Sequence, residues 1–191
     1  MKGMLHDKTV CYGTGSGAIT PERATVVFVH GAGFDHAVWV MPARYFARHK
    51  YNVVAPDLPA HGGSAGPALA SVEAMADWLH ELLASLGVSR VTVVGHSMGS
   101  LVALAYAQRY AGEVEGIALL GTASPMTVGP VLLDAAADNH PAAFAMANTW
   151  SHSHARLGDC LQQRQATQAQ RSSGWRCPAG QCLPPHLHNA A

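Results

Sequence analysis

Charged residues are scarce in this chain. Asp, Glu, Lys and Arg make up 13% of its 191 residues, and the 12 basic side chains balance the 12 acidic ones. An average soluble domain contains about 25% of such residues. Because there is no excess of positive charge, the sequence lacks the electrostatic footprint of a protein that binds nucleic acid or an anionic membrane surface. We therefore expect no nucleic-acid partner.

Long hydrophobic runs are also lacking, although apolar residues make up 49% of the chain. Gly, Ser or a charged residue interrupts each apolar stretch, so none reaches the roughly 20 residues of a membrane-spanning helix. The first residues, MKGMLHDK, contain no apolar core of a secretory signal. The cysteines show no disulfide-framework spacing, which is typical of a reducing compartment; they are Cys11, Cys160, Cys177 and Cys182. These absences predict no membrane span and a cytoplasmic location.

The chain does contain an alternation of β-branched runs and helical patterns. We expect strands at 8–12, 24–30, 51–55, 91–94 and 114–121, and helices at 36–49, 71–86, about 98–111 and within 131–150. Ser71 is the expected N-cap of the second helix, and Gly87 follows its last turn. The strands have the composition of strands buried on both faces. This pattern predicts an α/β fold with a mostly parallel sheet and helices on both faces.

The pentapeptide Gly95-His96-Ser97-Met98-Gly99 joins the strand at 91–94 to the helix that follows it. In this context G-x-S-x-G is typical of a nucleophile elbow, a turn so tight that side chains at the two glycine positions would collide. The serine at the apex is then strained, and its Oγ is exposed at the carboxyl end of the sheet. We interpret Ser97 as a catalytic nucleophile. An accidental turn serine is the alternative.

Acyl transfer by a serine also needs an oxyanion hole and a general base oriented by an acid. The segment His30-Gly31-Ala32-Gly33 directly follows the strand at 24–30, where its backbone N–H groups can pass over the Ser97 turn. A second donor is expected from the N–H of Met98, the residue after the nucleophile. An ordinary strand-to-helix turn is the alternative interpretation of H-G-x-G.

Three segments resemble, in the same order, the signatures of the α/β-hydrolase superfamily, with the nearest likeness to its small esterase and carboxylesterase-like members. They are HGAGFDHAVW (30–39), APDLPAHGGS (55–64) and VVGHSMG (93–99). The resemblance covers roughly residues 8–125. It implies a sheet covered by helices on both faces, a small-molecule ester-like substrate, and neither a metal nor an organic cofactor.

The resemblance also implies roles for individual residues. Ala32, the residue after His-Gly, corresponds to the position that commonly gives one oxyanion N–H. The second signature shapes the loop after a strand and is not catalytic; its matching residues are Asp57, His61, Gly62 and Ser64. We expect His30 and His61, which belong to these loop signatures, to form hydrogen bonds with the backbone.

The triad acid and histidine are the parts of the superfamily pattern that the sequence does not supply convincingly. In the superfamily both lie beyond a cap region, which here would begin near residue 125, and no Asp or Glu follows Asp159. The segment 161–191 contains Gln repeats and has no hydrophobic periodicity. We therefore expect 1–157 to form an incomplete core without its last two strands. We expect 158–191 to be a disordered or non-native tail, as in a truncated or frame-shifted hydrolase.

Several side chains are weak substitutes for the missing triad members. Asp134 and Asp138 follow the strand at 114–121, near the position of an alternative acid in some members of the superfamily. His96 adjoins Ser97, but successive side chains on such a turn diverge. Bases from further along the chain require the tail to fold back; these are His140, His152, His154, His186 and His188. The triad acid and histidine therefore stay unassigned.

A further tail pattern, C-x4-C-x3-H-x-H, could bind zinc adventitiously, although its spacing matches no standard finger. It consists of Cys177, Cys182, His186 and His188. The first functional hypothesis is thus a serine hydrolase that cleaves a carboxylic ester. The alternatives are an inactive hydrolase remnant, a C–C bond or lactone hydrolase of the same fold, and a binding module without chemistry. The sequence predicts neither the substrate nor the oligomeric state.

Overall fold

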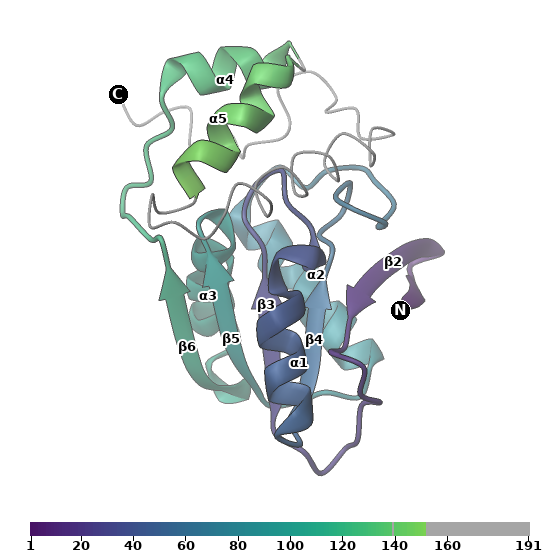
Figure 1. The fold of residues 1–191 in the computed structure, drawn as a ribbon. Coiled ribbons are helices and arrows are strands. Elements are labelled where there is room, and N and C mark those ends of the chain that lie inside the picture. The colour runs from purple at the N-terminus through teal and green to yellow at the C-terminus, as the bar shows by residue number, and fades with distance from the viewer. Residues whose placement is uncertain (139, 152–191) are drawn as a thin grey trace.

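A single sheet organises the molecule. A computed structural model describes residues 1–138 and 140–151 (Figure 1). Within them, six strands are ordered β1-β2-β4-β3-β5-β6. β3, β4, β5 and β6 pair in parallel, and β2 pairs antiparallel with both β1 and β4. Their bounds are β1 Lys2–Leu5, β2 Lys8–Gly13, β3 Thr25–Val29, β4 Asn52–Pro56, β5 Val91–His96 and β6 Val114–Leu120. The predicted α/β class with a mostly parallel sheet is confirmed.

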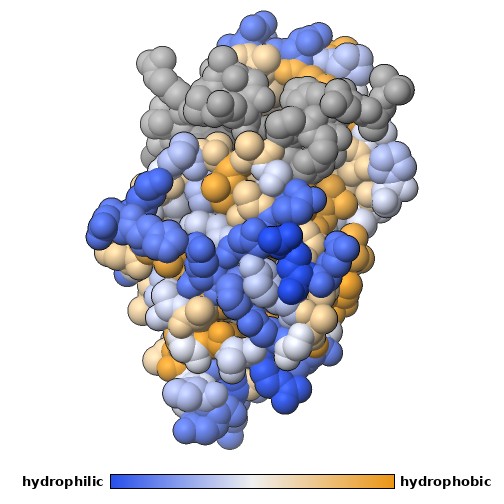
Figure 2. Space-filling model, turned by 180° about the vertical axis from the view of Figure 1, so that it is seen from behind, coloured by the Kyte–Doolittle hydropathy of each residue, from blue (hydrophilic) through white to orange (hydrophobic). Residues whose placement is uncertain are grey.

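Helices cover both faces of this sheet, as predicted. In Figure 1, α1 lies in front of the strands, α2 and α3 lie behind them, and α4 and α5 lie above their carboxyl ends. The bounds are η1 His36–Trp39, α1 Val40–Arg48, α2 Val72–Ser85, α3 Met98–Arg109, η2 Ala111–Glu113, α4 Pro130–Ala137 and α5 Pro141–Ser151. Seen from behind (Figure 2), the centre and lower part of the molecule are mostly hydrophilic, with apolar residues in small patches.

The helix expected at 36–49 is split into the 3-10 turn η1 and the helix α1. Asp35 caps η1, because its side chain accepts a hydrogen bond from the Ala37 N–H. Pro42, near the start of α1, lacks the N–H that an α-helix would donate to the carbonyl of Val38. The α-helical pattern therefore cannot run continuously through the whole segment. For α2, the predicted cap is confirmed, because the Ser71 side chain accepts from the Ala74 N–H at 3.0 Å.

Strand β1 was not expected from the sequence. It forms a hairpin with β2 in which Lys2 pairs with Cys11 and Leu5 pairs with Lys8. The two turn residues, His6 and Asp7, have φ angles of 49° and 61°. Such a turn is usually signalled by Asn-Gly or Asp-Gly. A His-Asp turn after a strand of four residues gives no comparable signal.

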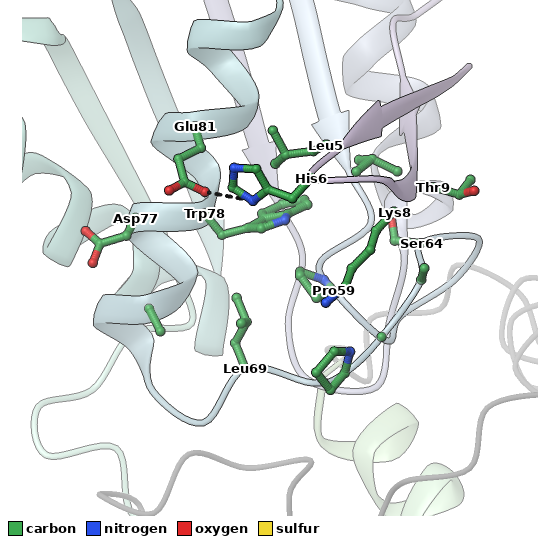
Figure 3. Close-up of a pocket in the computed structure, with 15 residues that line it drawn as sticks. Leu5, His6, Lys8, Thr9, Pro59, Ser64, Leu69, Asp77, Trp78 and Glu81 are labelled. Carbon is green, nitrogen blue, oxygen red and sulfur yellow. Dashed lines mark ion pairs between the residues drawn. The ribbon is translucent and has the colours of Figure 1, made fainter.

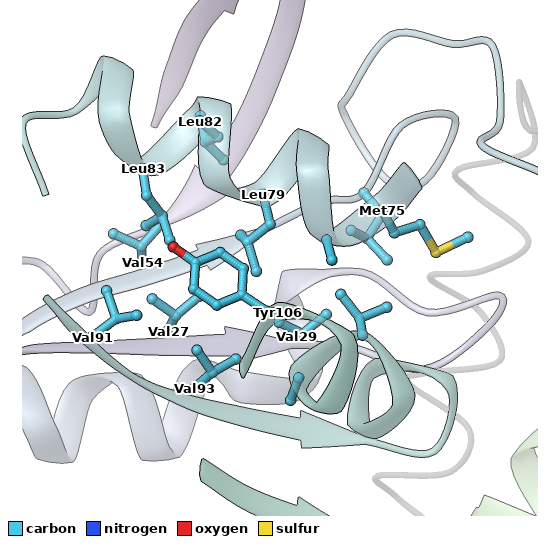
Figure 4. Packing of buried hydrophobic residues seen from close by; sticks show 14 of the residues in the cluster. Val27, Val29, Val54, Met75, Leu79, Leu82, Leu83, Val91, Val93 and Tyr106 are labelled. Carbon is cyan, nitrogen blue, oxygen red and sulfur yellow. The ribbon is translucent and has the colours of Figure 1, made fainter. Parts of the chain in front are cut away.

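Two apolar cores lie on opposite faces of the sheet because side chains alternate along each strand. Val27 and Val29 of β3 face α2 and α3, whereas Val26 and Phe28 belong to the core beneath α1. Figure 4 shows the ring of Tyr106 between the leucines of α2 and the valines of the strands. All five residues of β3 and all five of β4 are buried, as the sequence predicted.

Strand β6 departs from that prediction. The sequence pattern indicated a buried strand, but Ile117, Leu119 and Leu120 are 39%, 39% and 42% exposed. Among the described residues β6 pairs with β5 alone, so it is the edge strand of this part of the sheet. Burial of these side chains depends on a neighbouring strand, and the sequence also predicted that the last two strands of the sheet are missing, which leaves this edge exposed. None of the helices within 1–138 and 140–151 is long and apolar enough to cross a membrane.

Candidate active site

Ser97 occupies a strained turn between the end of β5 and the start of α3. Its φ of 52° and ψ of −122° lie in a region that residues other than glycine rarely adopt. The turn is held on both sides: the Ser97 N–H donates to the Leu120 carbonyl at 2.8 Å, and the Ser100 N–H donates to the Ser97 carbonyl at 2.8 Å. The elbow predicted from G-x-S-x-G is therefore present as backbone geometry.

The two glycines of the motif permit backbone contacts that no side chain would allow. A Cβ on Gly95 would lie 2.1 Å from the Gly99 carbonyl oxygen, and a Cβ on Gly99 would lie 2.3 Å from the Val29 carbonyl oxygen. Real Cβ atoms essentially never approach backbone so closely. The first contact closes the turn, and the second brings the N-terminus of α3 against the end of β3.

The loop after β3 passes directly beside Ser97. A Cβ on Gly31 would lie 3.2 Å from the Ser97 Cβ and 3.3 Å from the His96 Nδ1. The loop then turns sharply, since the Phe34 N–H donates to the Gly31 carbonyl at 3.3 Å. Half-buried Ala32 lies within this turn, and Met98 is buried at the first position of α3. Donation by their N–H groups to an oxyanion stays a prediction.

His30 connects this loop to the one that follows β4. Its Nδ1 lies 2.8 Å from the Gly31 carbonyl, and its Nε2 accepts from the Leu58 N–H at 3.1 Å. These partners assign the proton to Nδ1. Complete burial lowers the pKa of His30 to about 3, so the ring is neutral. His61 likewise lies 3.0 Å from the Pro59 carbonyl through Nδ1. The predicted backbone bonds of both histidines are confirmed.

Fully buried Asp57, the first residue after β4, contacts the far end of the loop that follows β3. Its Oδ1 accepts from the His36 N–H at 2.7 Å and lies 2.6 Å from the His36 Nδ1, while its Oδ2 accepts from the Gly63 N–H at 2.8 Å. Burial opposes ionisation of Asp57, but these hydrogen bonds hold its pKa below the usual range. The hydrogen bond between the side chains of His36 and Asp57 also raises the pKa of His36. Asp57 therefore ties the loop after β3 to the loop after β4, consistent with the non-catalytic role expected from the sequence.

Half-buried Cys11 of β2 completes this arrangement. Its N–H donates to Ser64 Oγ at 2.9 Å, and Ser64 Oγ donates to the Asp57 carbonyl at 2.7 Å. Burial raises the pKa of the Cys11 thiol, and the neighbouring Asp57 carboxylate raises it further. One ligand atom each from Cys11, His36 and Asp57 lie within 4.8 Å of one another. The sequence analysis missed this cluster, because no local spacing links positions 11, 36 and 57.

Three histidine–carboxylate pairs occur among the described residues, and none of them includes a residue of the Ser97 turn. His36 pairs with Asp57 after β4, His80 of α2 lies 3.1 Å from Glu113, and His6 of the hairpin lies 3.7 Å from Glu81. None of these carboxylates follows β6. The structure therefore supplies no assignment for the triad acid or histidine.

The substitute acids and bases that are described after β6 lie in or beside α4 and α5. Asp134 lies in α4, and the Asp138 N–H donates to its carbonyl at 3.1 Å. His140 caps α5, because its Nδ1 accepts from the Ala142 N–H at 3.1 Å. The remaining predicted positions lie outside the described residues; they are His152, His154, Cys177, Cys182, His186 and His188.

A cavity of about 380 Å³ lies between the β1–β2 hairpin and α2 (Figure 3). Trp78 and Leu69 line it together with the His6–Glu81 pair. Its lining includes no residue of the Ser97 turn or of the loop that contains Gly31. This cavity is therefore separate from the candidate active site.

Comparisons with known proteins agree with the fold. A family model described as the alpha/beta hydrolase fold matches residues 24–174. A curated relative, (E)-2-((N-methylformamido)methylene)succinate hydrolase of Acinetobacter baylyi, is 37% identical over 82 residues. That alignment covers 42% of this chain and 31% of the relative, so the chain spans less than a third of the relative's length.

Solved structures are similar over most of this chain. A membrane phospholipase A described as a bacterial virulence factor is 26% identical, with a TM-score of 0.68 over 92% of this chain and 59% of its own. A thermophilic esterase from Thermogutta terrifontis is 23% identical, with a TM-score of 0.71 over 96% of this chain and 68% of its own. The latter likeness concerns the fold alone.

Proposed function

Because the chain belongs to the alpha/beta hydrolase fold family, we propose that it is a serine hydrolase that cleaves a carboxylic ester with Ser97 as nucleophile. The observation that carries the proposal is the turn at Ser97, whose φ is 52° and which lies against Gly31 of the loop after β3. Similarity to a phospholipase A at 26% identity supports an ester as the substrate class.

In this proposal Ser97 Oγ attacks the ester carbonyl carbon, and its proton leaves with the alcohol when the carbon–oxygen bond of the ester breaks. Water then hydrolyses the acyl-enzyme and releases the acid. The N–H groups of Ala32 and Met98 stabilise the negative oxygen of each tetrahedral intermediate. Met98 is the first residue of α3, so the partial positive charge of the helix N-terminus acts on the same oxygen.

The rate of turnover separates a working hydrolase from an inactive remnant. In a serine protease, loss of the base alone costs about 10⁶ in kcat. The oxyanion hole and binding still leave roughly 10³–10⁴-fold acceleration over water. A chain with the Ser97 turn but no base in reach is therefore expected to stay within that residual range. A complete triad exceeds it by orders of magnitude.

The test uses a fluorophosphonate probe and p-nitrophenyl acetate on the purified chain. We expect labelling and turnover that disappear in Ser97→Ala and persist in Ser89→Ala, because Ser89 is exposed and lies outside the turn. Labelling that is absent, or that does not depend on Ser97, contradicts the proposal. Faster turnover of a lactone or of a C–C bond substrate than of any ester changes the substrate class and keeps the nucleophile.

A second variant tests the loop rather than the serine. Gly31→Ala introduces a Cβ 3.2 Å from the Ser97 Cβ, and the loop must move away by a few tenths of an ångström. Loss of one oxyanion donor costs about 10²–10³ in kcat, so we expect a clear fall in the labelling rate. Gly112→Ala is the matched control, since its added Cβ meets no atom within 4 Å. Equal labelling rates for the two variants exclude the loop from the site.

A further inference from the structure

Three segments that are far apart in the sequence converge beside the end of β4. Cys11 lies on β2, His36 begins η1, and Asp57 directly follows β4. Two hydrogen bonds from backbone N–H groups fix their approach: the Asp57 N–H donates to the Cys11 carbonyl at 2.8 Å, and the His36 N–H donates to the side-chain Oδ1 of Asp57 at 2.7 Å. The juxtaposition is therefore a property of the fold rather than of mobile side chains.

The donor set is that of a zinc site. A thiolate, an imidazole and a carboxylate are the three ligand types that Zn²⁺ takes in proteins, at about 2.0–2.3 Å. Two ligand atoms of a tetrahedral zinc then lie about 3.5 Å apart. The three donor atoms here lie within 4.8 Å of one another, and His36 Nδ1 lies 2.6 Å from Asp57 Oδ1 in a hydrogen bond. Binding of zinc therefore needs shifts of about an ångström that open this hydrogen bond and bring the other donor atoms closer. Asp57 is fully buried, while half-buried Cys11 and His36 leave a path from solvent.

Two consecutive glycines of the loop after β4 lie against this cluster. A Cβ on Gly63 would lie 3.1 Å from Cys11 Sγ, and a Cβ on Gly62 would lie 2.3 Å from Asp57 Oδ2. Gly62 also has a φ of 51°, which residues with a side chain rarely adopt. These positions therefore let the chain wrap closely around the three potential ligands.

We propose that Cys11, His36 and Asp57 bind a borderline divalent cation such as Zn²⁺, which ties β2 and the loop after β4 to the loop after β3. On binding, bonds from zinc to sulfur, nitrogen and oxygen replace the thiol S–H bond and the hydrogen bond between His36 Nδ1 and Asp57 Oδ1. The thiol proton goes to solvent, the proton between His36 and Asp57 leaves that bond, His36 binds as the neutral ring, and no group is oxidised or reduced. Since the loop after β3 also contains Gly31, the metal stiffens the segment beside Ser97. The proposal does not depend on the activity of Ser97.

The experiment titrates Co²⁺ into the untagged, reduced, chelator-treated full chain. A thiolate ligand gives Co²⁺ a sulfur-to-metal charge-transfer absorption. We expect this absorption to saturate at one equivalent and to be displaced by Zn²⁺. Cys11→Ala should abolish this absorption. His36→Asn should weaken metal binding by about 10–100-fold or more, since substitution of a residue that only orients a metal ligand already has an effect of this size. Circular dichroism confirms that each variant is folded.

The matched control is the double variant Cys177→Ala/Cys182→Ala, which removes the cysteines of the tail pattern and leaves Cys11 in place. It should keep the full absorption. A signal that survives in Cys11→Ala and disappears in the double variant overturns the proposal in favour of adventitious binding by the tail. A wild-type chain with no charge-transfer absorption at one equivalent of Co²⁺ overturns it as well.

Discussion

β5 and β6 are neighbouring parallel strands with similar apolar composition, but they differ in what surrounds them. β5 lies between β3 and β6, and its end is fixed by the glycine contacts of the Ser97 turn. In β6, four consecutive residues from Ile117 to Leu120 are exposed. The comparison shows that apolar sequence makes a strand, whereas the strand's neighbours decide how much its side chains contribute to stability.

Alanine substitution of one glycine in each strand should give the largest contrast. Gly95→Ala places a Cβ 2.1 Å from the Gly99 carbonyl oxygen. The Gly99 backbone cannot move away from this Cβ unless the turn opens. We expect a loss above about 4 kcal/mol in the free energy of unfolding, in the exceptional range for one substitution. Chemical denaturation followed by circular dichroism measures it.

Gly116→Ala in β6 is the matched control. Its Cβ meets only the Thr92 side chain at 3.8 Å, an ordinary contact. We expect no loss, or a gain of about 0.4–1 kcal/mol, because alanine restricts the unfolded chain. Equal destabilisation by the two alanines contradicts the distinction between a fixed strand end and a loosely covered edge.

Leucine truncation on each side of the contrast should give the next largest effect. Leu79 of α2 is completely buried against the strands, whereas Leu119 of β6 is 39% exposed. Leu79→Ala should cost about 2–5 kcal/mol, since it removes buried methylenes and leaves a cavity. Leu119→Ala should cost below about 1 kcal/mol. Denaturant midpoints at unchanged slope measure both, and a larger loss at Leu119 contradicts the observed burial.

The same contrast shows how far sequence reasoning extends. The roles of Gly95 and Gly99 were predictable, because a tight turn is a local structure and the residues that it requires lie next to one another in the sequence. The exposure of Leu119 could be predicted only from the expected absence of the last two strands, because it depends on a strand beside β6 rather than on the residues of β6. The cluster around Cys11 was not predictable, since β2 approaches Asp57 only after an unpredicted hairpin places it antiparallel to β4.

The turn at Ser97 and the loop beside it were predictable for the same local reason, because both are motifs directly after a strand. The triad acid and histidine were not, because these groups reach a serine across the fold and have no fixed spacing from it. The described residues place His36 and His80 in pairs that belong to other parts of the molecule. Local backbone geometry was therefore predictable, whereas contacts between side chains from distant segments were not.

The exposed strand should also change how the 191-residue chain behaves in solution. An edge strand with exposed apolar side chains is a template for pairing with another chain. We expect concentration-dependent association that Leu119→Lys reduces, because a charge on the edge opposes pairing. Sedimentation velocity over a range of concentrations measures this. The control is Met41→Lys on α1, where the side chain is 74% exposed on a helix that covers a face of the sheet; an equal reduction by both lysines contradicts a role for β6.

The smallest expected contrast concerns two surface ion pairs. Arg109 donates to both carboxylate oxygens of Asp77 at 2.7 and 2.9 Å, and Tyr110 donates to Asp77 as well at 2.7 Å, which links α3 to α2. Arg90 and Glu115 of β6 make one contact at 3.2 Å with side chains 72% and 37% exposed. Asp77→Asn should therefore lower the melting temperature slightly, and Glu115→Gln should leave it unchanged.

The pH dependence of that small effect has a definite sign. The hydrogen bonds from Arg109 and Tyr110 lower the pKa of Asp77 below its usual value of 3.8. A carboxylate whose pKa is lowered on folding stabilises the folded state at pH values above its pKa in the unfolded chain. This contribution disappears as the pH falls through the pKa of the carboxylate in the folded protein. The difference between wild type and Asp77→Asn should thus be present at neutral pH, shrink in acid and shrink in high salt. A difference that grows in acid contradicts the assignment, because only the ionised carboxylate accepts all three bonds.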